Sequence, residues 1–279
     1  MKNIIDAIIS IINEPVIEIT ECYKLVTGEI KAQIALEEYV KDMFSGTFSF
    51  SQDKRQPIID EVFSYQGNHS SPPDAMLRGG DAIEVKRVNS YNAKLMLNSS
   101  YPKQILSCDS SIISPVCKNA EKWNEKDMLY IIAVVINNKL RHLSLVYGED
   151  FCMSDEYYNR IRKAFKKSIE EIEGIKFTET NELGRINNID KIGNTYLRVR
   201  GMWAIDNPLV IFKDVYERPK SAEFSFMAII NEQKWKSLKN KNKLIQEGKN
   251  KKHFQLKNIN IKNPTTSKDK KAKLISFYI

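Results

Sequence analysis

Residues 72–88 read PPDAMLRGGDAIEVKRV. Two short apolar runs lie on either side of a Gly-Gly pair, so this stretch predicts two antiparallel strands joined by a tight turn. Glu84 and Lys86 interrupt the second apolar run. Because alternate side chains of a strand share a face, these two charged groups are expected to project together. Burial would come from the opposite face, to which we assign Ile83, Val85 and Val88.

The length of the hairpin loop decides whether Asp74 joins these side chains. With a three-residue loop over 79–81, Asp74 lies opposite Lys86 and on the same face as both charged groups. A two-residue Gly-Gly turn instead places Asp74 opposite Val85, with its side chain turned away. We expect the three-residue loop, because it brings both carboxylates and the Lys86 ammonium to one surface. Asp81 is interpreted as a turn residue, because its position in the strand faces away from Glu84.

The two carboxylates Asp74 and Glu84 suggest a metal site. Carboxylates that converge on one point repel each other unless a cation lies between them, and hard oxygen ligands suit Mg²⁺ that keeps several waters. The main-chain carbonyl of Val85 could complete the coordination. Beside such a metal, Lys86 could orient a water, help to deprotonate it or stabilise charge on a phosphate. These groups together predict phosphodiester hydrolysis.

The composition is typical of a globular protein. The chain has 279 residues, 42% of them hydrophobic and 28% charged, enough for one large α/β domain or two small ones. Its four cysteines are too scattered for a paired zinc site or a disulfide scaffold. Residues 1–15 are typical of a helix rather than a signal peptide, and no apolar stretch reaches the roughly 20 residues of a membrane span. We therefore expect a cytoplasmic protein that does not contact a membrane.

The positive charge is concentrated near the C-terminus. The net charge is +8, and residues 236–273 contain thirteen lysines but only two acids, Glu247 and Asp269. Such a segment could follow a phosphate backbone, because each neutralised phosphate releases a counterion. Lysine runs are also commonly solvated surface in a chain this rich in Lys, Asn and Ile. Both interpretations stay open.

The hydrophobic periodicity predicts a mixed α/β protein. Helices are expected over 4–12, 28–46, from 118 to about 127, and over 154–173. Strands are expected over 128–137, 140–148, 195–203, 208–216, 223–230 and 272–279. Our working division is a catalytic core over 1–175 and a β-rich, lysine-rich DNA-recognition part over 176–279 that is not an independent domain.

The charged hairpin resembles a known nuclease motif. Pro73-Asp74 followed by Glu84-Val85-Lys86 resembles the two halves of the PD-(D/E)xK motif. GDAIEVK, LNSSYPK at 97–103 and ELGRINNIDKIGNTYLRVRGMW at 182–203 resemble the NgoPII-type type II restriction endonucleases, and the similarity covers nearly the whole chain. The resemblance implies a restriction-endonuclease-like core in which a mixed β-sheet is flanked by helices.

The family resemblance also implies an activity. It implies a Mg²⁺-dependent homodimer that cleaves double-stranded DNA at GGCC and is paired with a matching DNA methyltransferase. A two-fold dimer matches the symmetry of a palindrome. A repair or recombination nuclease with structure specificity and the same core is one alternative. A non-catalytic basic DNA-binding protein, unaffected by Mg²⁺, is the other.

The resemblance adds further candidate site residues. In that superfamily the helix before the hairpin often supplies another acid, here Glu37 or Glu38. Glu37 is the first candidate, because it shares a helical face with Val40, Lys41 and Phe44 and could point toward the site, although a solvated helix face explains either residue equally well. The 97–103 block offers short donors for phosphate oxygens: Asn98, Ser99, Ser100, Tyr101 and Lys103.

Readout of a G/C site needs donors to the O6 and N7 atoms of guanine, a task most often performed by arginine. Arg198 and Arg200 would lie on one face of the strand expected over 195–203, with Arg185 upstream. Exposed arginines or phosphate contacts are the alternative interpretation of these residues.

Overall fold

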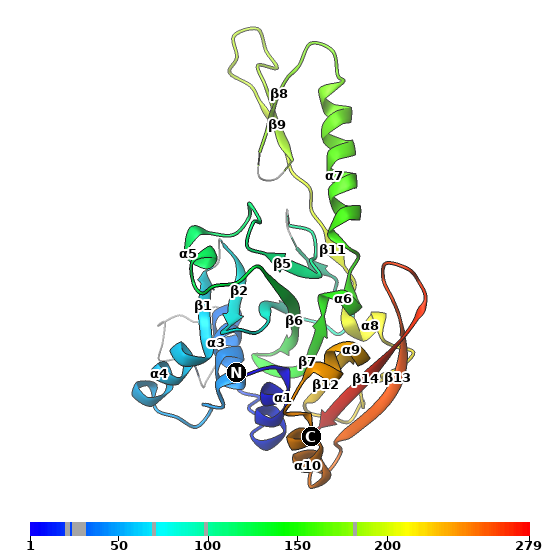
Figure 1. Cartoon of the computed structure of the whole chain (residues 1–279). Coiled ribbons are helices and arrows are strands. Elements are labelled where there is room, and N and C mark those ends of the chain that lie inside the picture. Colours follow the sequence, from blue (N-terminus) through cyan, green and yellow to red (C-terminus); the bar gives the residue numbers. More distant parts are fainter. Residues whose placement is uncertain (20–22, 24–31, 69–70, 98–99, 181–182) are drawn as a thin grey trace.

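A mixed sheet forms the centre of the protein (Figure 1). The computed structural model describes residues 1–19, 23, 32–68, 71–97, 100–180 and 183–279. Within these residues nine strands make the sheet, eight of them in the following order and the ninth, β5 (Ile105–Ser107), pairing with β6. The order is β1 (Phe63–Asn68), β2 (Ser71–Leu77), β3 (Ala82–Val88), β6 (Glu125–Ile136), β7 (Lys139–Tyr147), β12 (Ser225–Asn231), β14 (Asp269–Tyr278) and β13 (Gln255–Lys262).

The sheet is mixed because two of its pairings are parallel. β3 runs parallel to β6, and β7 runs parallel to β12, whereas the other neighbours are antiparallel. β6 is buried on both faces, as expected from its apolar run. Asn137 and Asn138 both have positive φ, which gives the tight turn that leads from β6 into β7.

Helices cover both faces of the sheet. On one face α1 (Ile4–Asn13) and α3 (Ala32–Ser45) pack in a core cluster with Ile83 and Ile131. The other face is covered by α5 (Pro115–Lys118), α6 (Gly148–Phe151), α8 (Pro208–Ile211) and a small sheet of β4 (Leu95–Met96) and β11 (Ala204–Ile205). The remaining helices of the body are α4 (Gln52–Val62), α9 (Glu232–Ser237) and α10 (Lys241–Lys249).

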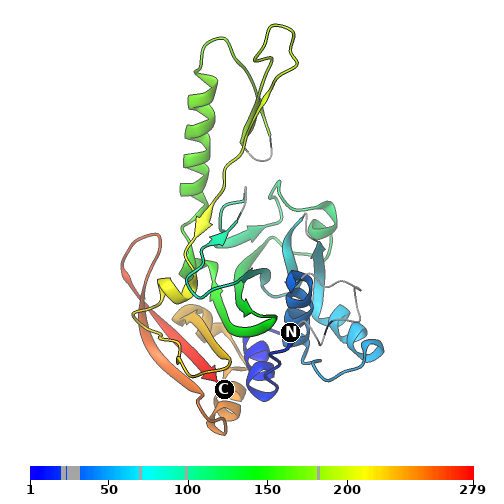
Figure 2. The ribbon, with the colours of Figure 1, turned by 180° about the vertical axis from the view of Figure 1, so that it is seen from behind.

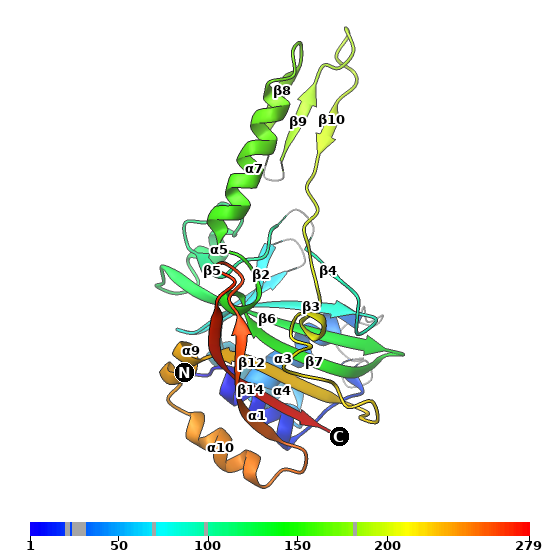
Figure 3. The ribbon, with the colours of Figure 1, turned by 90° about the vertical axis from the view of Figure 1, so that its right-hand side faces the viewer.

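An arm extends away from this body (Figures 1 and 2). It consists of α7 (Asp155–Glu170) and a three-stranded sheet of β8 (Lys176–Glu179), β9 (Gly184–Asn187) and β10 (Leu197–Val199). Seen from the side, α7 runs alongside these strands (Figure 3). At the base of the arm Tyr158 stacks on Tyr101 with 5.0 Å between ring centroids and meets Trp203 edge-on at 5.2 Å.

Most of the expected elements are confirmed. The mixed α/β class is confirmed, as are the helices near 4–12 and 154–173 and the strands that became β6, β7, β12 and β14. The helix expected over 28–46 is described from Ala32 onward and ends where Gly46 takes a positive φ. Residues 28–31 lie outside the described part of the chain.

Two expected elements were wrong, and a third is shorter than expected. The helix expected from 118 to 127 is absent from the described chain, because α5 ends at Lys118 and β6 already begins at Glu125. The strand expected over 208–216 is instead the short helix α8, which Asn207 caps by accepting the Leu209 N–H. The strand expected over 195–203 is confirmed only for the three residues of β10, and β11 begins just after this range at Ala204.

Residues on both sides of position 175 contribute to one sheet. β12, β13 and β14 join the central sheet through the parallel pairing of β12 with β7. The lysine-rich segment 236–273 forms α10, the edge strand β13 and the start of β14. The assignment of 176–279 to DNA recognition stays a prediction. None of the described helices has the length and apolar character needed to cross a membrane.

Candidate active site

The hairpin has the expected three-residue loop, but the loop begins one residue earlier. The Leu77 N–H donates to the Asp81 carbonyl at 2.9 Å, so the loop consists of 78–80. β2 pairs with β3 through Ala75–Ile83 and Met76–Ala82. Continued by one residue beyond Ala75–Ile83, this register places Asp74 opposite Glu84, so the expected pairing of Asp74 with Lys86 was wrong. The loop remains odd, so the three charged side chains still share one face.

The register also corrects the burial pattern of β3. Ile83 and Val85 belong to the core cluster beneath α1 and α3, as expected. Val88 packs in the opposite cluster together with Ala82. Its assignment to the face of Ile83 was wrong, because residues an even number apart share a face.

Asp74 is held at the point where its strand separates from β3. Its Oδ2 accepts the Val85 N–H at 2.7 Å, in place of a main-chain partner. Burial, reinforced by the charge of Glu84, raises the pKa of Asp74 to about 7, against the lowering effect of Lys86 and the Val85 N–H. Glu84 therefore lies close enough to Asp74 for its charge to oppose the ionisation of Asp74.

Lys86 partly neutralises this pair. Its Nζ lies 2.5 Å from Glu84 Oε1. Burial alone would lower the pKa of Lys86, but the charges of Glu84 and Asp74 outweigh it and raise the pKa. Lys86 is therefore a cation at neutral pH and is suited to stabilising negative charge rather than to removing a proton.

The structure separates the two acids of α3. Gln33 Nε2 donates to Glu37 Oε1 at 3.0 Å and to the Val85 carbonyl at 3.3 Å, which ties Glu37 to the strand that carries Glu84. The charge of Glu37 also contributes to raising the pKa of Asp74. Glu38 is turned to a different partner, because its Oε2 lies 2.6 Å from Arg55 Nη2.

Asp81 also lies apart from these groups. Its Oδ2 accepts the Tyr147 hydroxyl at 2.8 Å, and its Oδ1 is 2.6 Å from Lys234 Nζ. These contacts hold the hairpin tip against β7 and α9.

The oxygen donors at this place fit a hard divalent cation. Among the residues that the structure describes, no group of three or more His, Cys, Asp or Glu side chains is arranged to hold a metal ion. The donors available are two carboxylates, Asp74 and Glu84, and the Val85 carbonyl. A small cation that keeps several waters needs no more protein ligands than these. A cation between the carboxylates would also relieve the repulsion that raises the pKa of Asp74.

Part of the 97–103 block lies next to Glu84. Ser100 and Lys103 line a small cavity of about 50 Å³ together with Glu84 and Tyr130. Lys103 is buried, its Nζ lies 3.7 Å from the centre of the Tyr101 ring, and burial lowers its pKa. Asn98 and Ser99 lie outside the described residues.

The candidate base-reading arginines lie on the arm. Arg185 of β9 pairs directly with Arg198 of β10, so these two side chains share a face of the arm's sheet. The Arg185 guanidinium also lies 3.6 Å from the centre of the Tyr196 ring. Arg200 follows the end of β10, so the arrangement of Arg198 and Arg200 on one strand was wrong. All three arginines are exposed.

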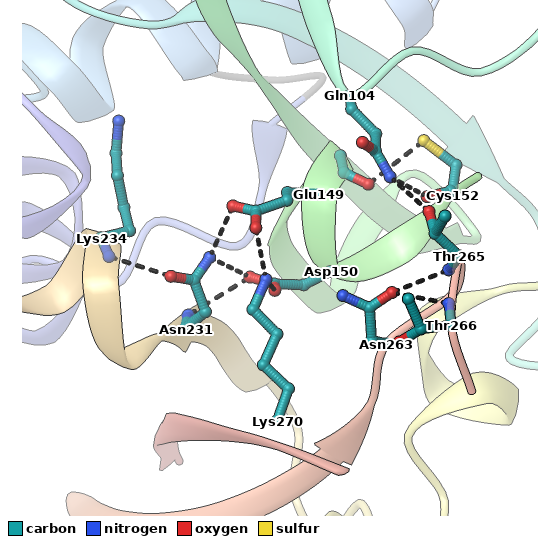
Figure 4. A network of polar contacts seen from close by, with 11 residues as sticks. Gln104, Glu149, Asp150, Cys152, Asn231, Lys234, Asn263, Thr265, Thr266 and Lys270 are labelled. Atoms are coloured by element: carbon teal, nitrogen blue, oxygen red, sulfur yellow. Dashed lines mark hydrogen bonds and ion pairs between the residues drawn. The ribbon is translucent and has the colours of Figure 1, made fainter. Parts of the chain in front are cut away.

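A polar network not anticipated from the sequence lies at the base of the arm (Figure 4). The buried Asp150 carboxylate lies 2.8 Å from Lys270 Nζ and accepts the Asn231 side-chain amide at 2.9 Å. Nearby, Gln104 Nε2 donates to the Cys152 carbonyl at 2.7 Å. This network joins α6, β12 and β14 and so anchors the segment from which α7 departs. No local pattern reveals it, because Asp150 and Lys270 are 120 positions apart in the chain.

Comparison with known proteins identifies the family of the chain. The model of the NgoPII restriction endonuclease family matches residues 2–262. The chain belongs to this family. The type II restriction enzyme NgoPII of Neisseria gonorrhoeae is 49% identical to it over 281 residues, which cover 99% of this chain and 100% of the relative. No solved structure matched the chain.

Family membership confirms the resemblance seen in the sequence. It also confirms the restriction-endonuclease-like fold class and the assignment of the chain as a type II restriction endonuclease, a site-specific deoxyribonuclease.

Proposed function

We propose that this member of the NgoPII restriction endonuclease family hydrolyses phosphodiester bonds of double-stranded DNA at the palindrome GGCC, with Mg²⁺ as its cofactor. The observation that carries the chemistry is the convergence of Asp74 and Glu84 beside the Lys86 ammonium, with the pKa of Asp74 raised to about 7. The GGCC target rests on the family resemblance.

Each residue of the site has a proposed role. Asp74, Glu84 and the Val85 carbonyl would hold Mg²⁺, which supplies Lewis-acid stabilisation of negative charge on the phosphate when bound. Lys86 donates hydrogen bonds that orient the attacking water and stabilise charge in the transition state. Glu37, fixed by Gln33, adds a further negative charge at the same place. That charge helps to retain both the cation and the protonated lysine.

DNA recognition is divided between the body and the arm. Ser100, Lys103 and their neighbours Asn98 and Ser99 are proposed to contact phosphates near the catalytic groups. Arg185, Arg198 and Arg200 are proposed to donate to guanine O6 and N7 in the major groove. The pairing of Arg185 with Arg198 supports this role, because it places both side chains on one face of the arm's sheet, and strands can read bases in the major groove.

The remaining features follow from the substrate. A palindrome presents two equivalent strands, so we propose a homodimer with one active site for each strand. Cleavage of a short and frequent site would also damage the cell's own DNA. We therefore propose a cytoplasmic enzyme paired with a DNA methyltransferase that protects the same sequence.

The test is a digest of phage-length duplex DNA by the purified protein with Mg²⁺ or with EDTA, followed by sequencing of the fragment ends. Ends that share GGCC and appear only with Mg²⁺ are expected. Discrete ends at another palindrome would reject the target but keep the chemistry, whereas intact DNA would reject the proposal. Glu84→Gln should prevent cleavage, and Asp53→Asn, at an exposed acid of α4, is the matched control.

A further inference from the structure

The helix of the arm exposes an unusual amount of apolar surface. Of sixteen large hydrophobic side chains exposed in the described chain, nine lie between residues 157 and 202. None of the residues of α7 is buried, although the helix is amphipathic. Exposed apolar side chains that are clustered rather than scattered mark surfaces that another molecule covers.

The exposed apolar side chains of α7 form one stripe. Tyr157, Ile161 and Phe165 follow each other at intervals of four residues, and Ile172 lies just beyond the helix end, with exposed fractions between 38% and 59%. Residues spaced in this way lie on one side of a helix. Ala164 and Ser168 are exposed on the same side and are small.

The arm's own sheet occupies a different side of α7. Lys166 forms an ion pair with Glu179 of β8. Arg162 and Ile169, which lie on the same side of the helix as Lys166, are half-buried. Because this side already packs against the strands, the stripe is an additional surface that the arm leaves uncovered.

The stripe is complementary to itself. A two-fold axis through the midpoint between Ala164 and Phe165 would pair the helix with an antiparallel copy. Phe165 would then meet the small Ala164 of the copy, Ile161 would meet Ser168, and Tyr157 would meet Ile172. Large side chains thus face small ones at the centre, which lets two helices approach closely.

The charges beside the stripe agree with the same pairing. Arg160 and Glu171 lie on the same flank of the stripe, eleven positions apart. In the antiparallel arrangement Arg160 of each copy approaches Glu171 of the other, so the pairing gains two ion pairs at its rim. In the single chain Arg160 lies over the Tyr157 ring, and Glu171 forms only an exposed pair with Lys167 at 3.8 Å. Such an exposed pair contributes little to stability and is readily exchanged.

We propose that the stripe Tyr157, Ile161, Ala164, Phe165 and Ser168 of α7 is the surface through which two copies of this chain associate, antiparallel and about a two-fold axis. The inference deepens the proposed homodimer by naming its contact surface. An isologous contact of this kind leaves Arg185 and Arg198, on the other face of the arm's sheet from α7, available to DNA in both copies.

The first experiment is sedimentation equilibrium of the full chain in EDTA without DNA. Phe165→Glu places a charge next to the axis in both copies and is expected to raise the dimer dissociation constant by at least roughly 100-fold. Lys163→Glu is the matched control, because it introduces the same side chain on the opposite, exposed side of the helix. This control should remain as dimeric as the natural chain.

The second experiment is disulfide trapping. Ala164→Cys lies at the axis and is expected to give a cross-linked dimer under mild oxidation, whereas Lys163→Cys and the natural chain should not. A monomeric natural chain, a Phe165→Glu variant that dimerises normally, or the absence of a cross-link specific to Ala164→Cys would each overturn the inference. If Phe165→Glu stays dimeric and still yields discrete Mg²⁺-dependent fragments, this surface is rejected while the proposed cleavage reaction stands.

Discussion

Replacing Asp74 by asparagine should make the metal-free protein more stable at pH 8 while removing its activity. Asp74 is largely enclosed, and its pKa rises from 3.8 to about 7 through burial and the charge of Glu84. Such a rise corresponds to at most about 4 kcal/mol of lost stability once the folded carboxylate is forced to ionise. Asparagine keeps the shape and can still accept the Val85 N–H. We expect Asp74→Asn to add about 2–4 kcal/mol to the free energy of unfolding.

The pH dependence gives the sign of this effect. Below pH 3.8 the carboxyl is protonated in both the folded and the unfolded chain. In this range Asp74 therefore does not lower the free energy of unfolding. Between pH 3.8 and about 7 the unfolded chain ionises while the folded carboxyl keeps its proton, and the natural protein loses stability as the pH rises. Above pH 7 the loss is complete. The stability difference between variant and natural chain should therefore grow from pH 4 to pH 7 and then stay constant.

Urea unfolding in EDTA at pH 5 and pH 8, followed by circular dichroism, measures this difference. Adding Mg²⁺ should then stabilise the natural chain and leave Asp74→Asn unchanged, because a ligand that binds only the folded state adds to its stability. Glu84→Gln is the second variant, and it should reduce the pH dependence by removing the neighbouring charge. A variant less stable than the natural chain at pH 8, or a difference that is equal at both pH values, would refute the reasoning.

Three further changes probe other parts of the structure. Lys86→Ala should lower the single-turnover cleavage rate at least about 100-fold, while DNA binding measured in Ca²⁺ survives, because the ammonium acts on charge in the transition state. Arg55→Met should lower the free energy of unfolding in urea by about 3–5 kcal/mol, because it leaves the buried Asp42 carboxylate, 2.5 Å from Arg55 Nε, without its cation. Burial lowers the pKa of His142 to about 3, so stability should fall as the pH drops below 6.5, by about 2 kcal/mol at pH 5. Chemical denaturation of His142→Gln, which should lack this loss, checks the assignment.

Local patterns in the sequence were sufficient for the hairpin and the central strands. The hairpin over 72–88 has a loop with an odd number of residues. Because side chains alternate along each strand, any odd loop places Asp74, Glu84 and Lys86 on one face. The position of the loop was less certain from the sequence. Gly79 and Gly80 suit several turns, and the main-chain bonds between Leu77 and Asp81 decide among them.

Features that depend on residues far apart in the chain could not be predicted from the sequence. Helical spacing favours Glu37 over Glu38 as the acid that faces the site, but only the positions of Gln33 and Arg55 in the fold show the different partners of these two residues. The segment 208–216 has the apolar composition of a strand, but the cap provided by Asn207 begins a helix there. The arm could not be foreseen either, since an amphipathic helix normally indicates packing on the body of a protein.

The lysine-rich segment 236–273 contains one edge of the central sheet, the strand β13. Among the described strands none pairs with the outer side of β13, so its free main-chain groups face outward. An open edge of this kind can add a strand from another molecule and start aggregation. Lys257 and Lys262 of β13 are exposed. If the β13 edge of a second copy paired with this edge, the lysines of the two copies would lie close together and repel each other. We therefore expect the lysines on this edge to oppose such pairing, whether or not the segment also contacts DNA.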